Sequence, residues 1–234
     1  MKLLVLTSPF LFIFFSLNAQ SRNYKEIMKQ DWAQLEQYKE ANQEIIESSN
    51  WPEVVFMGNS ITEGWANTRP EFFQENNYVG RGIGGQTTPQ MLVRFTQDVI
   101  DLKPKIVVIL AGTNDIAGNT GFSSVKMIID NLKAMALLAE RNNFKVILSS
   151  ILPVYDYPWS PGLEPVSKIK EINSWLENYA IENGFIYLDY FSHLRNDKNG
   201  MKNIYSEDGV HPNAKAYKVM EPLVQTAIKK AMKR

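Results

Sequence analysis

Residues 104–115 run Pro-Lys-Ile-Val-Val-Ile-Leu-Ala-Gly-Thr-Asn-Asp, and this stretch decides the fold. The run 105–111 is apolar after Lys105, short, rich in β-branched residues and bounded by proline and glycine. Such a run predicts a strand that is buried on both faces. Strands of that kind are typical of parallel sheets covered by helices on either side.

Strand and helix patterns alternate on both sides of this run. Further short apolar runs predict strands at 54–57, 78–79, 144–152 and 185–188. Amphipathic patterns predict helices at 24–48, 88–100, 123–141, 165–182 and from Pro212 to the end. Five strands in this alternation predict a three-layer α/β/α domain with a flavodoxin-like, five-stranded parallel sheet.

The first 19 residues have the composition of a secretory signal peptide. Lys2 gives a charged start, residues 3–17 are almost wholly apolar, and Ala19 is a small residue suited to cleavage. The apolar run is shorter than the roughly 20 residues that span a bilayer, which favours cleavage over a retained anchor. We therefore expect residues 20–234 to form one secreted or periplasmic domain without a stable membrane anchor.

Composition argues against several functions. The chain has no Cys, which excludes disulfides, thiolate catalysis and cysteine-ligated zinc. It carries 25 basic and 25 acidic residues and so lacks the basic excess typical of nucleic-acid binding. The glycine-rich run 80–85 matches a dinucleotide-binding pattern but follows the second strand rather than the first. We expect no nucleic acid partner, metal or other cofactor, and the sequence leaves the oligomeric state open.

Four short polar segments lie directly after predicted strands or before the last helix. They are Gly-Asn-Ser-Ile-Thr at 58–62, Gly-Ile-Gly-Gly-Gln-Thr-Thr at 82–88, Gly-Thr-Asn-Asp at 112–115 and Asp-Gly-Val-His-Pro at 208–212. Sites in doubly wound sheets lie beyond the carboxyl ends of the strands. The sequence therefore predicts that these four segments converge on one polar site.

Two of the segments contain the groups needed for acyl transfer. Asp208 precedes His211 by three residues, with Gly209 between them, so its carboxylate can reach the imidazole within one loop. Ser60 stands between a strand and a predicted helix. Taken singly, Asp208 also fits an ordinary turn and Ser60 an ordinary helix N-cap. Taken together, they predict Ser60 as nucleophile, His211 as base and Asp208 as the acid that orients it.

Other residues are candidates for binding charge or substrate. The backbone N–H groups of Ser60 and Gly85 and the side-chain amide of Asn114 are candidate oxyanion donors, although Gly85 also fits a loop with positive φ and Asn114 an Asx turn. Four aromatic residues close to these segments are possible substrate contacts, although packing explains them equally well: Trp65, Tyr155, Tyr157 and Trp159.

In this order the four segments resemble the blocks of the SGNH hydrolases, also called the GDSL lipase/acylhydrolase family. Residues Ser60, Gly85 and Asn114 match blocks one to three, and 208–211 matches the D-x-x-H pair of block five. Gly-Ile-Gly-Gly at 82–85 also looks like the acetylhydrolase branch related to platelet-activating-factor acetylhydrolase catalytic subunits.

Two positions depart from the family pattern. Asn59 stands where the family's name-giving block has Asp. Gln86 stands where Asp is frequent after the block-two glycine. Neither is the matched nucleophile, base or oxyanion donor, so ester hydrolysis is still expected.

The resemblance implies a serine esterase that acts on carboxylic esters through an acyl-enzyme. We favour acetyl esters of a carbohydrate, because nothing in the sequence predicts a large lipid-binding surface. One alternative is a lysophospholipase or thioesterase-type lipid acylhydrolase. Another is a non-catalytic glycan-binding module on the same fold. The expected partner is a small-molecule or glycan ester.

Overall fold

The computed structural model describes residues 26 and 29–234, so the predicted signal peptide lies outside the described residues. Five parallel strands form one sheet in the order β2-β1-β3-β4-β5. The strands are β1 (Val54–Asn59), β2 (Tyr78–Ile83), β3 (Ile106–Leu110), β4 (Lys145–Ser149) and β5 (Ile186–Leu188). This is the flavodoxin-like order, and the predicted fold class is confirmed.

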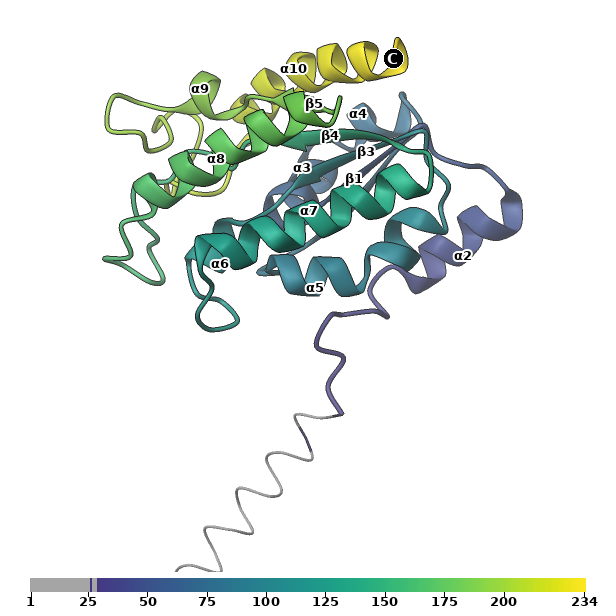
Figure 1. The fold of residues 1–234 in the computed structure, drawn as a ribbon, viewed down its shortest axis with the longest axis horizontal. Coiled ribbons are helices and arrows are strands. Elements are labelled where there is room, and N and C mark those ends of the chain that lie inside the picture. The colour runs from purple at the N-terminus through teal and green to yellow at the C-terminus, as the bar shows by residue number, and fades with distance from the viewer. Residues whose placement is uncertain (1–25, 27–28) are drawn as a thin grey trace, which may run out of the picture.

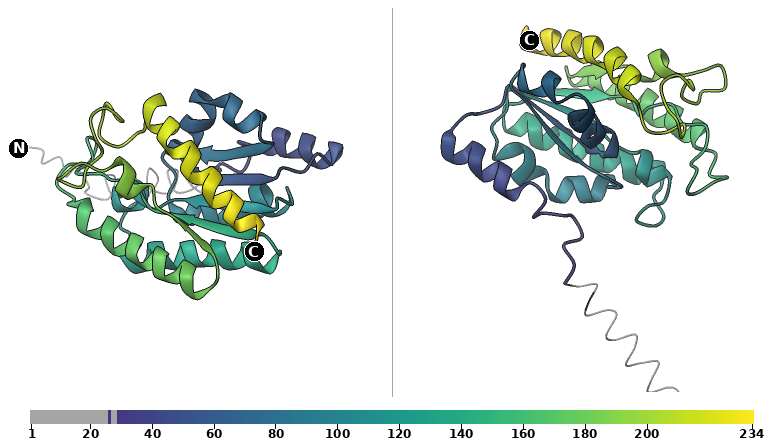
Figure 2. Two further views of the ribbon diagram at one scale, coloured as in Figure 1. Left: turned by 90° about the horizontal axis from the view of Figure 1, so that it is seen from above. Right: turned by 180° about the vertical axis from the view of Figure 1, so that it is seen from behind.

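Helices cover both faces of the sheet because its strands are apolar on both sides (Figure 1). One face packs against α5 (Thr88–Val93), α7 (Val125–Arg141) and α8 (Pro165–Glu182). The other packs against α3 (Ser60–Thr68), α4 (Pro70–Gln74) and α10 (Ala214–Met232). Figure 2 shows α10 running across the second face. Along β1, Val55 and Met57 join the first core, whereas Val54 and Phe56 join the second.

The segment before β1 corrects one predicted helix. The sequence pattern predicts a helix at 24–48, but α2 spans only Lys39–Ser48, and residues 29–38 form turns. The backbone carbonyls of these turns accept hydrogen bonds from glutamine side chains. Gln90 Nε2 donates to Trp32 O at 2.7 Å, and Gln97 Nε2 donates to Leu35 O at 2.7 Å. Tertiary hydrogen bonds thus outweigh the helical pattern in this segment.

Two other helix boundaries differ from prediction. The helix predicted at 88–100 is α5 followed by a π-helical turn, η1 (Thr96–Ile100), where the side chains of Arg94 and Asp98 both point into the core. The last helix begins at Ala214 rather than Pro212, because Asn213 is its N-cap and accepts from the backbone N–H groups of the first turn. The short helices α6 (Thr113–Ile116) and α9 (Phe191–Leu194) complete the fold.

Strand ends also differ, and this matters at the site. β4 ends at Ser149, earlier than predicted, whereas β1 and β2 continue beyond their predicted ends to Asn59 and Ile83. The longer β2 requires glycine at Gly82, because a Cβ there would overlap the backbone of Asn59 and Glu63. Glycines weaken the strand pattern of β2 in the sequence, and in the structure the glycine at Gly82 lets β2 lie against the start of α3.

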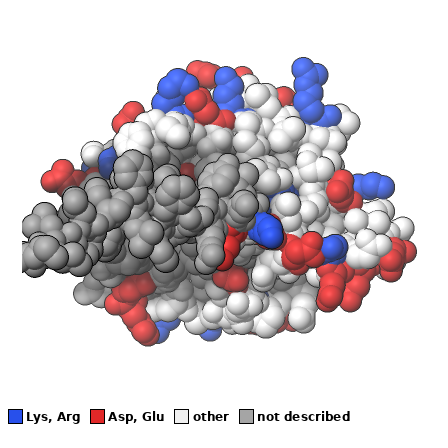
Figure 3. Space-filling model, turned by 90° about the horizontal axis from the view of Figure 1, so that it is seen from below, with Lys and Arg blue, Asp and Glu red and all other residues white. Residues whose placement is uncertain are grey.

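Figure 3 shows one face of the molecule, on which both acidic and basic side chains lie outside the grey atoms, with acidic side chains gathered at the right-hand edge. Among the described residues, no helix combines the length and apolar character required to cross a membrane.

Candidate active site

All four polar segments contribute to one cavity beyond the carboxyl ends of β1, β2 and β3. The cavity has a volume of about 260 Å³. It is lined by Ser60, Gly85, Asn114, Asn119, Trp159 and His211. The predicted convergence of the segments is therefore present in the structure.

Ser60 is placed by the tight turn from β1 into α3. Asn59 is the N-cap: its Oδ1 accepts from Ile61 N at 3.0 Å, which leaves Ser60 as the first helical residue. Glycine is required at Gly58, because a Cβ there would overlap the side chain of Thr62. Asn59 caps the helix as Asp would, so this departure from the family pattern preserves the turn.

A chain of hydrogen bonds links three of the predicted residues. Ser60 Oγ lies 3.0 Å from His211 Nε2, and His211 Nδ1 lies 2.6 Å from Asp208 Oδ2. When a hydroxyl, an imidazole and a carboxylate are linked in this order, the imidazole can take the proton of the hydroxyl. The carboxylate then stabilises the imidazolium that forms.

Asp208 is held in a cradle of hydrogen-bond donors. Its Oδ1 accepts from Val210 N at 2.9 Å, His211 N at 2.8 Å and Ser206 Oγ at 3.0 Å. Partial burial raises the pKa of Asp208, but the hydrogen bonds from His211, Val210 and Ser206 together outweigh it and lower the pKa to about 2. Ser206, which the sequence analysis missed, thus helps to keep the carboxylate ionised.

This cradle predicts a pH-dependent stability difference between the wild type and Asp208→Asn. The pKa of Asp208 in the fold, about 2, lies below its ordinary 3.8, so the carboxylate stabilises the fold above that ordinary value. The contribution is lost as the pH falls toward 2. We expect the wild-type Tm to exceed that of Asp208→Asn at pH 5 and the margin to shrink as the pH falls from about 4. Scanning fluorimetry from pH 2.5 to pH 5 measures it; a margin that widens between about pH 4 and pH 2.5 would contradict the assignment.

The opposite wall of the cavity carries Gly85 and Asn114. Gly85 has φ +73°, which favours glycine, and its carbonyl accepts from Asn119 Nδ2 at 3.1 Å. Asn114 is buried, and its Nδ2 donates to the carbonyl of Gln86 at 2.9 Å. An amide nitrogen carries two hydrogens, so this bond orients Asn114 and leaves the second hydrogen for a ligand in the cavity.

Two of the four predicted aromatic contacts lie in the core. Trp65 is 1% exposed and stacks on Phe72 and Tyr217, with ring centroids at 5.4 and 5.5 Å. Tyr157 is fully buried, and its hydroxyl lies 2.9 Å from Thr113 Oγ1. The prediction that these two side chains line the substrate site is wrong, because their rings fill the interior of the fold.

The other two aromatics are exposed, but only one lines the cavity. Tyr155 is 61% exposed and lines a separate depression with Asp156 and Lys170. Trp159 has its ring centroid 5.9 Å from that of His211, and its Nε1 donates to Asn119 Oδ1 at 3.2 Å. Asn119, which the sequence analysis did not single out, therefore joins Trp159 to Gly85 across the cavity.

Within the described part of the chain, no group of three or more His, Cys, Asp or Glu residues is arranged to hold a metal ion. The second histidine of the chain, His193, lies outside the cavity lining, and its Nδ1 lies 3.0 Å from the carbonyl oxygen of Asp189.

A hydroxyl–imidazole–carboxylate chain at the carboxyl edge of an α/β sheet is an arrangement that acyl-transfer hydrolases share. The chain belongs to the GDSL-like lipase/acylhydrolase family, whose family model matches residues 56–219. The match includes every residue that lines the cavity. Family membership places the chain among the carboxylic ester hydrolases.

Solved structures agree with this assignment. A candidate acylhydrolase from Bacteroides fragilis is 45% identical, with a TM-score of 0.82, and the match covers 86% of this chain and 99% of the other. A GDSL-like lipase from Bacteroides thetaiotaomicron is 41% identical, also with a TM-score of 0.82, over 86% and 100% of the two chains. An acetylxylan esterase from Geobacillus stearothermophilus shares the fold at 16% identity and a TM-score of 0.60, over 75% and 93%.

A curated relative matches over a shorter region. The Bacillus subtilis lipoprotein YqeF, whose activity is uncharacterized, is 27% identical over 151 residues. The match covers 63% of this chain and 56% of the relative, so the chain spans little more than half of that protein's length.

The narrower resemblance to the platelet-activating-factor acetylhydrolase branch stays a prediction.

Proposed function

We propose that the protein is a secreted serine esterase that removes short acyl groups, above all acetyl, from a carbohydrate. The observation that carries this proposal is the Ser60–His211–Asp208 hydrogen-bond chain, with distances of 3.0 and 2.6 Å, facing the same cavity as Gly85 and Asn114. Residues 1–19 would be removed on export, and the mature protein would act in the periplasm or outside the cell.

The mechanism consists of two acyl transfers. His211 takes the proton of Ser60 as Oγ attacks the ester carbonyl, and Asp208 stabilises the imidazolium. His211 then gives the proton to the departing alcohol, leaving an acyl-enzyme on Ser60. Water, deprotonated by His211, attacks this acyl group, and the acid leaves as Ser60 regains its proton.

The negative charge that forms on the carbonyl oxygen needs hydrogen-bond donors. Ser60, Gly85 and Asn114 all line the cavity, and the proposed donors are the backbone N–H groups of the first two and the Nδ2 of Asn114. Because the protein fixes them before substrate arrives, they need no reorganisation when the charge develops.

One wall of the cavity is braced by hydrogen bonds, and this bracing supports a short acyl group. Trp159 and Asn119 are joined by a hydrogen bond of 3.2 Å, and Asn119 is joined to Gly85 at 3.1 Å. Asp156 braces the Trp159 loop by accepting from Gly162 N and Tyr157 N at 3.0 and 2.9 Å. A wall held by these bonds does not move to make room for a long acyl chain. A second support is that an acetylxylan esterase is among the proteins of similar fold.

The acyl-length preference tests this reading directly. We expect kcat/KM for nitrophenyl esters to fall from acetyl through butyryl and hexanoyl to octanoyl, by roughly 10- to 100-fold in total. This range corresponds to an overpacking cost of about 1–3 kcal/mol. A tunnel that buried each methylene would instead gain up to about 0.8 kcal/mol per group. A maximum at hexanoyl or longer would reject the short-acyl proposal and favour the lipid acylhydrolase.

A matched pair of variants locates the cause. Trp159→Ala should flatten the decline by opening the cavity wall. Tyr155→Ala, from the same loop but lining a different depression, should leave it unchanged. Parallel assays on acetylated xylan, pectin and sialic acid identify the alcohol that leaves the ester. A fluorophosphonate that labels the wild type but not Ser60→Ala excludes the non-catalytic binding module.

A further inference from the structure

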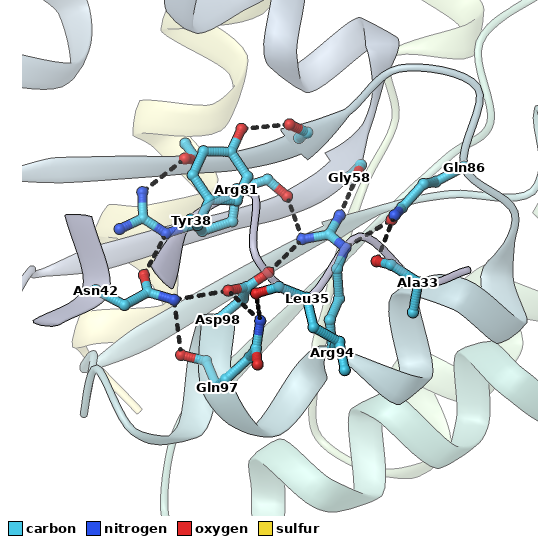
Figure 4. A network of polar contacts seen from close by, with 12 residues as sticks. Ala33, Leu35, Tyr38, Asn42, Gly58, Arg81, Gln86, Arg94, Gln97 and Asp98 are labelled. Carbon is cyan, nitrogen blue, oxygen red and sulfur yellow. Dashed lines mark hydrogen bonds and ion pairs between the residues drawn. The ribbon is translucent and has the colours of Figure 1, made fainter. Parts of the chain in front are cut away.

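A network of buried polar side chains lies behind the cavity, between the ends of β1 and β2 and the segment before α2 (Figure 4). Arg94 is at its centre and is fully buried. Its guanidinium donates to Gly58 O at 2.8 Å, Arg81 O at 3.0 Å and Asp98 Oδ2 at 2.8 Å. Because Gly58 lies two residues before Ser60, Arg94 fixes the strand end from which the nucleophile emerges.

Gln86 connects this network to the cavity. Its Oε1 accepts from Arg94 Nε at 2.6 Å, and its Nε2 donates to Ala33 O at 2.8 Å. Its main-chain carbonyl accepts from Asn114 Nδ2 at 2.9 Å, and it directly follows Gly85. The side chain of Gln86 is thus fixed by Arg94 and Ala33. Its backbone in turn positions the two proposed oxyanion donors Asn114 and Gly85.

The segment before α2 and the first turn of α2 are both fixed beside Gln86. Asn42 Nδ2 donates to Asp98 Oδ1 at 2.7 Å, and its Oδ1 accepts from Arg81 Nε at 2.8 Å. The Tyr38 hydroxyl donates to the carbonyl of Gly82, and the Tyr38 ring lies under the Arg81 guanidinium at 4.7 Å. Ala33 therefore presents its carbonyl to Gln86 from a braced position.

The chemistry of the side chain explains glutamine at this position. Gln86 must accept from Arg94 and donate to a backbone carbonyl simultaneously. An ionised Asp, the residue frequent here in the family, has no hydrogen to donate and is one methylene shorter.

We propose that Gln86 is a positioning residue for the oxyanion hole. It transmits the placement of the Arg94 guanidinium and of the Ala33 carbonyl to Asn114 and Gly85. This inference rests on the proposed function, since it assigns the device that sets two of its oxyanion donors.

A double-mutant cycle tests the proposal on nitrophenyl acetate. We expect Gln86→Leu to lower kcat by about 10- to 100-fold with little change in KM, as for a displaced catalytic donor. In an Asn114→Ala background the same substitution should lower kcat by a clearly smaller factor, because one of the two donors that Gln86 positions is already absent. Gln97→Leu is the matched control: it removes the bond to Leu35 O in the same segment and should leave kcat within about 2-fold.

Three results would overturn the proposal: an unchanged kcat in Gln86→Leu, losses that multiply fully with Asn114→Ala, or an effect confined to KM. If Gln86→Leu does not fold, Gln86→Glu takes its place in the cycle, since it keeps an acceptor for Arg94 and opposes only the Ala33 carbonyl. Failure of the proposed function is distinguishable, because it would appear as wild-type turnover that is absent or independent of Ser60.

Discussion

Replacing Ser60 by Ala should reduce kcat for ester hydrolysis by about 10³- to 10⁶-fold while the protein stays folded. The substitution removes one hydroxyl from a half-buried position whose neighbours are polar, so it leaves no apolar cavity. His211→Ala should cost as much, because an unassisted serine hydroxyl is a weak nucleophile at neutral pH. Steady-state assays on nitrophenyl acetate and a melting curve for each variant measure both effects.

The two losses should not multiply. If Ser60 and His211 act as one unit, the double variant is no slower than either single variant. His193→Ala is the control, because it removes the other histidine, whose contact is with a backbone carbonyl outside the cavity; it should retain turnover. A Ser60→Ala variant with near-normal turnover would remove the central proposal.

How far the sequence predicts this fold depends on the kind of strand. β3 is a continuous apolar run because both of its faces are buried, and such a run is visible without any structure. β2 is interrupted by glycines at Gly80 and Gly82, so its pattern predicts only its first two residues. The glycines are there because β2 lies against α3, which is a tertiary fact. The turns at 29–38 were missed for the same reason, since their partners lie more than 50 residues away.

The site divides in the same way. Asp208 and His211 are predictable as a pair because their spacing alone brings the two side chains together within one loop. Asn119 and Ser206 carry no such local signal, since their importance comes from contacts with Trp159, Gly85 and the carboxylate.

The position of Trp65 follows from the geometry of α3. Five residues at about 100° each place Trp65 some 140° around α3 from Ser60, on the face that turns away from the cavity. In the structure that face stacks on Phe72 and Tyr217 in the core. Helical geometry thus predicts that Trp65 points away from the site, and nearness to Ser60 in the sequence does not predict a place in it.

The second large effect is expected at Asn114. Asn114→Ala should lower kcat by about 10²- to 10³-fold and leave KM nearly unchanged. The reason is that the amide is proposed to bind charge present only in the transition state, so ground-state binding does not depend on it. Its orientation is fixed by the Gln86 carbonyl at 2.9 Å, which aligns the free hydrogen before substrate binds.

Asn119→Ala provides the comparison that isolates this role. Asn119 has the same side chain and lines the same cavity, but its two polar atoms already bond to Gly85 O and Trp159 Nε1. Its loss should loosen the acyl wall and shift chain-length preference while lowering kcat on acetyl esters by less than about 10-fold. Full kinetics for both variants on acetyl and hexanoyl esters separate the two roles. If Asn114→Ala raised KM and spared kcat, Asn114 would bind the ground-state substrate, and the oxyanion hole would consist of the backbone donors of Ser60 and Gly85.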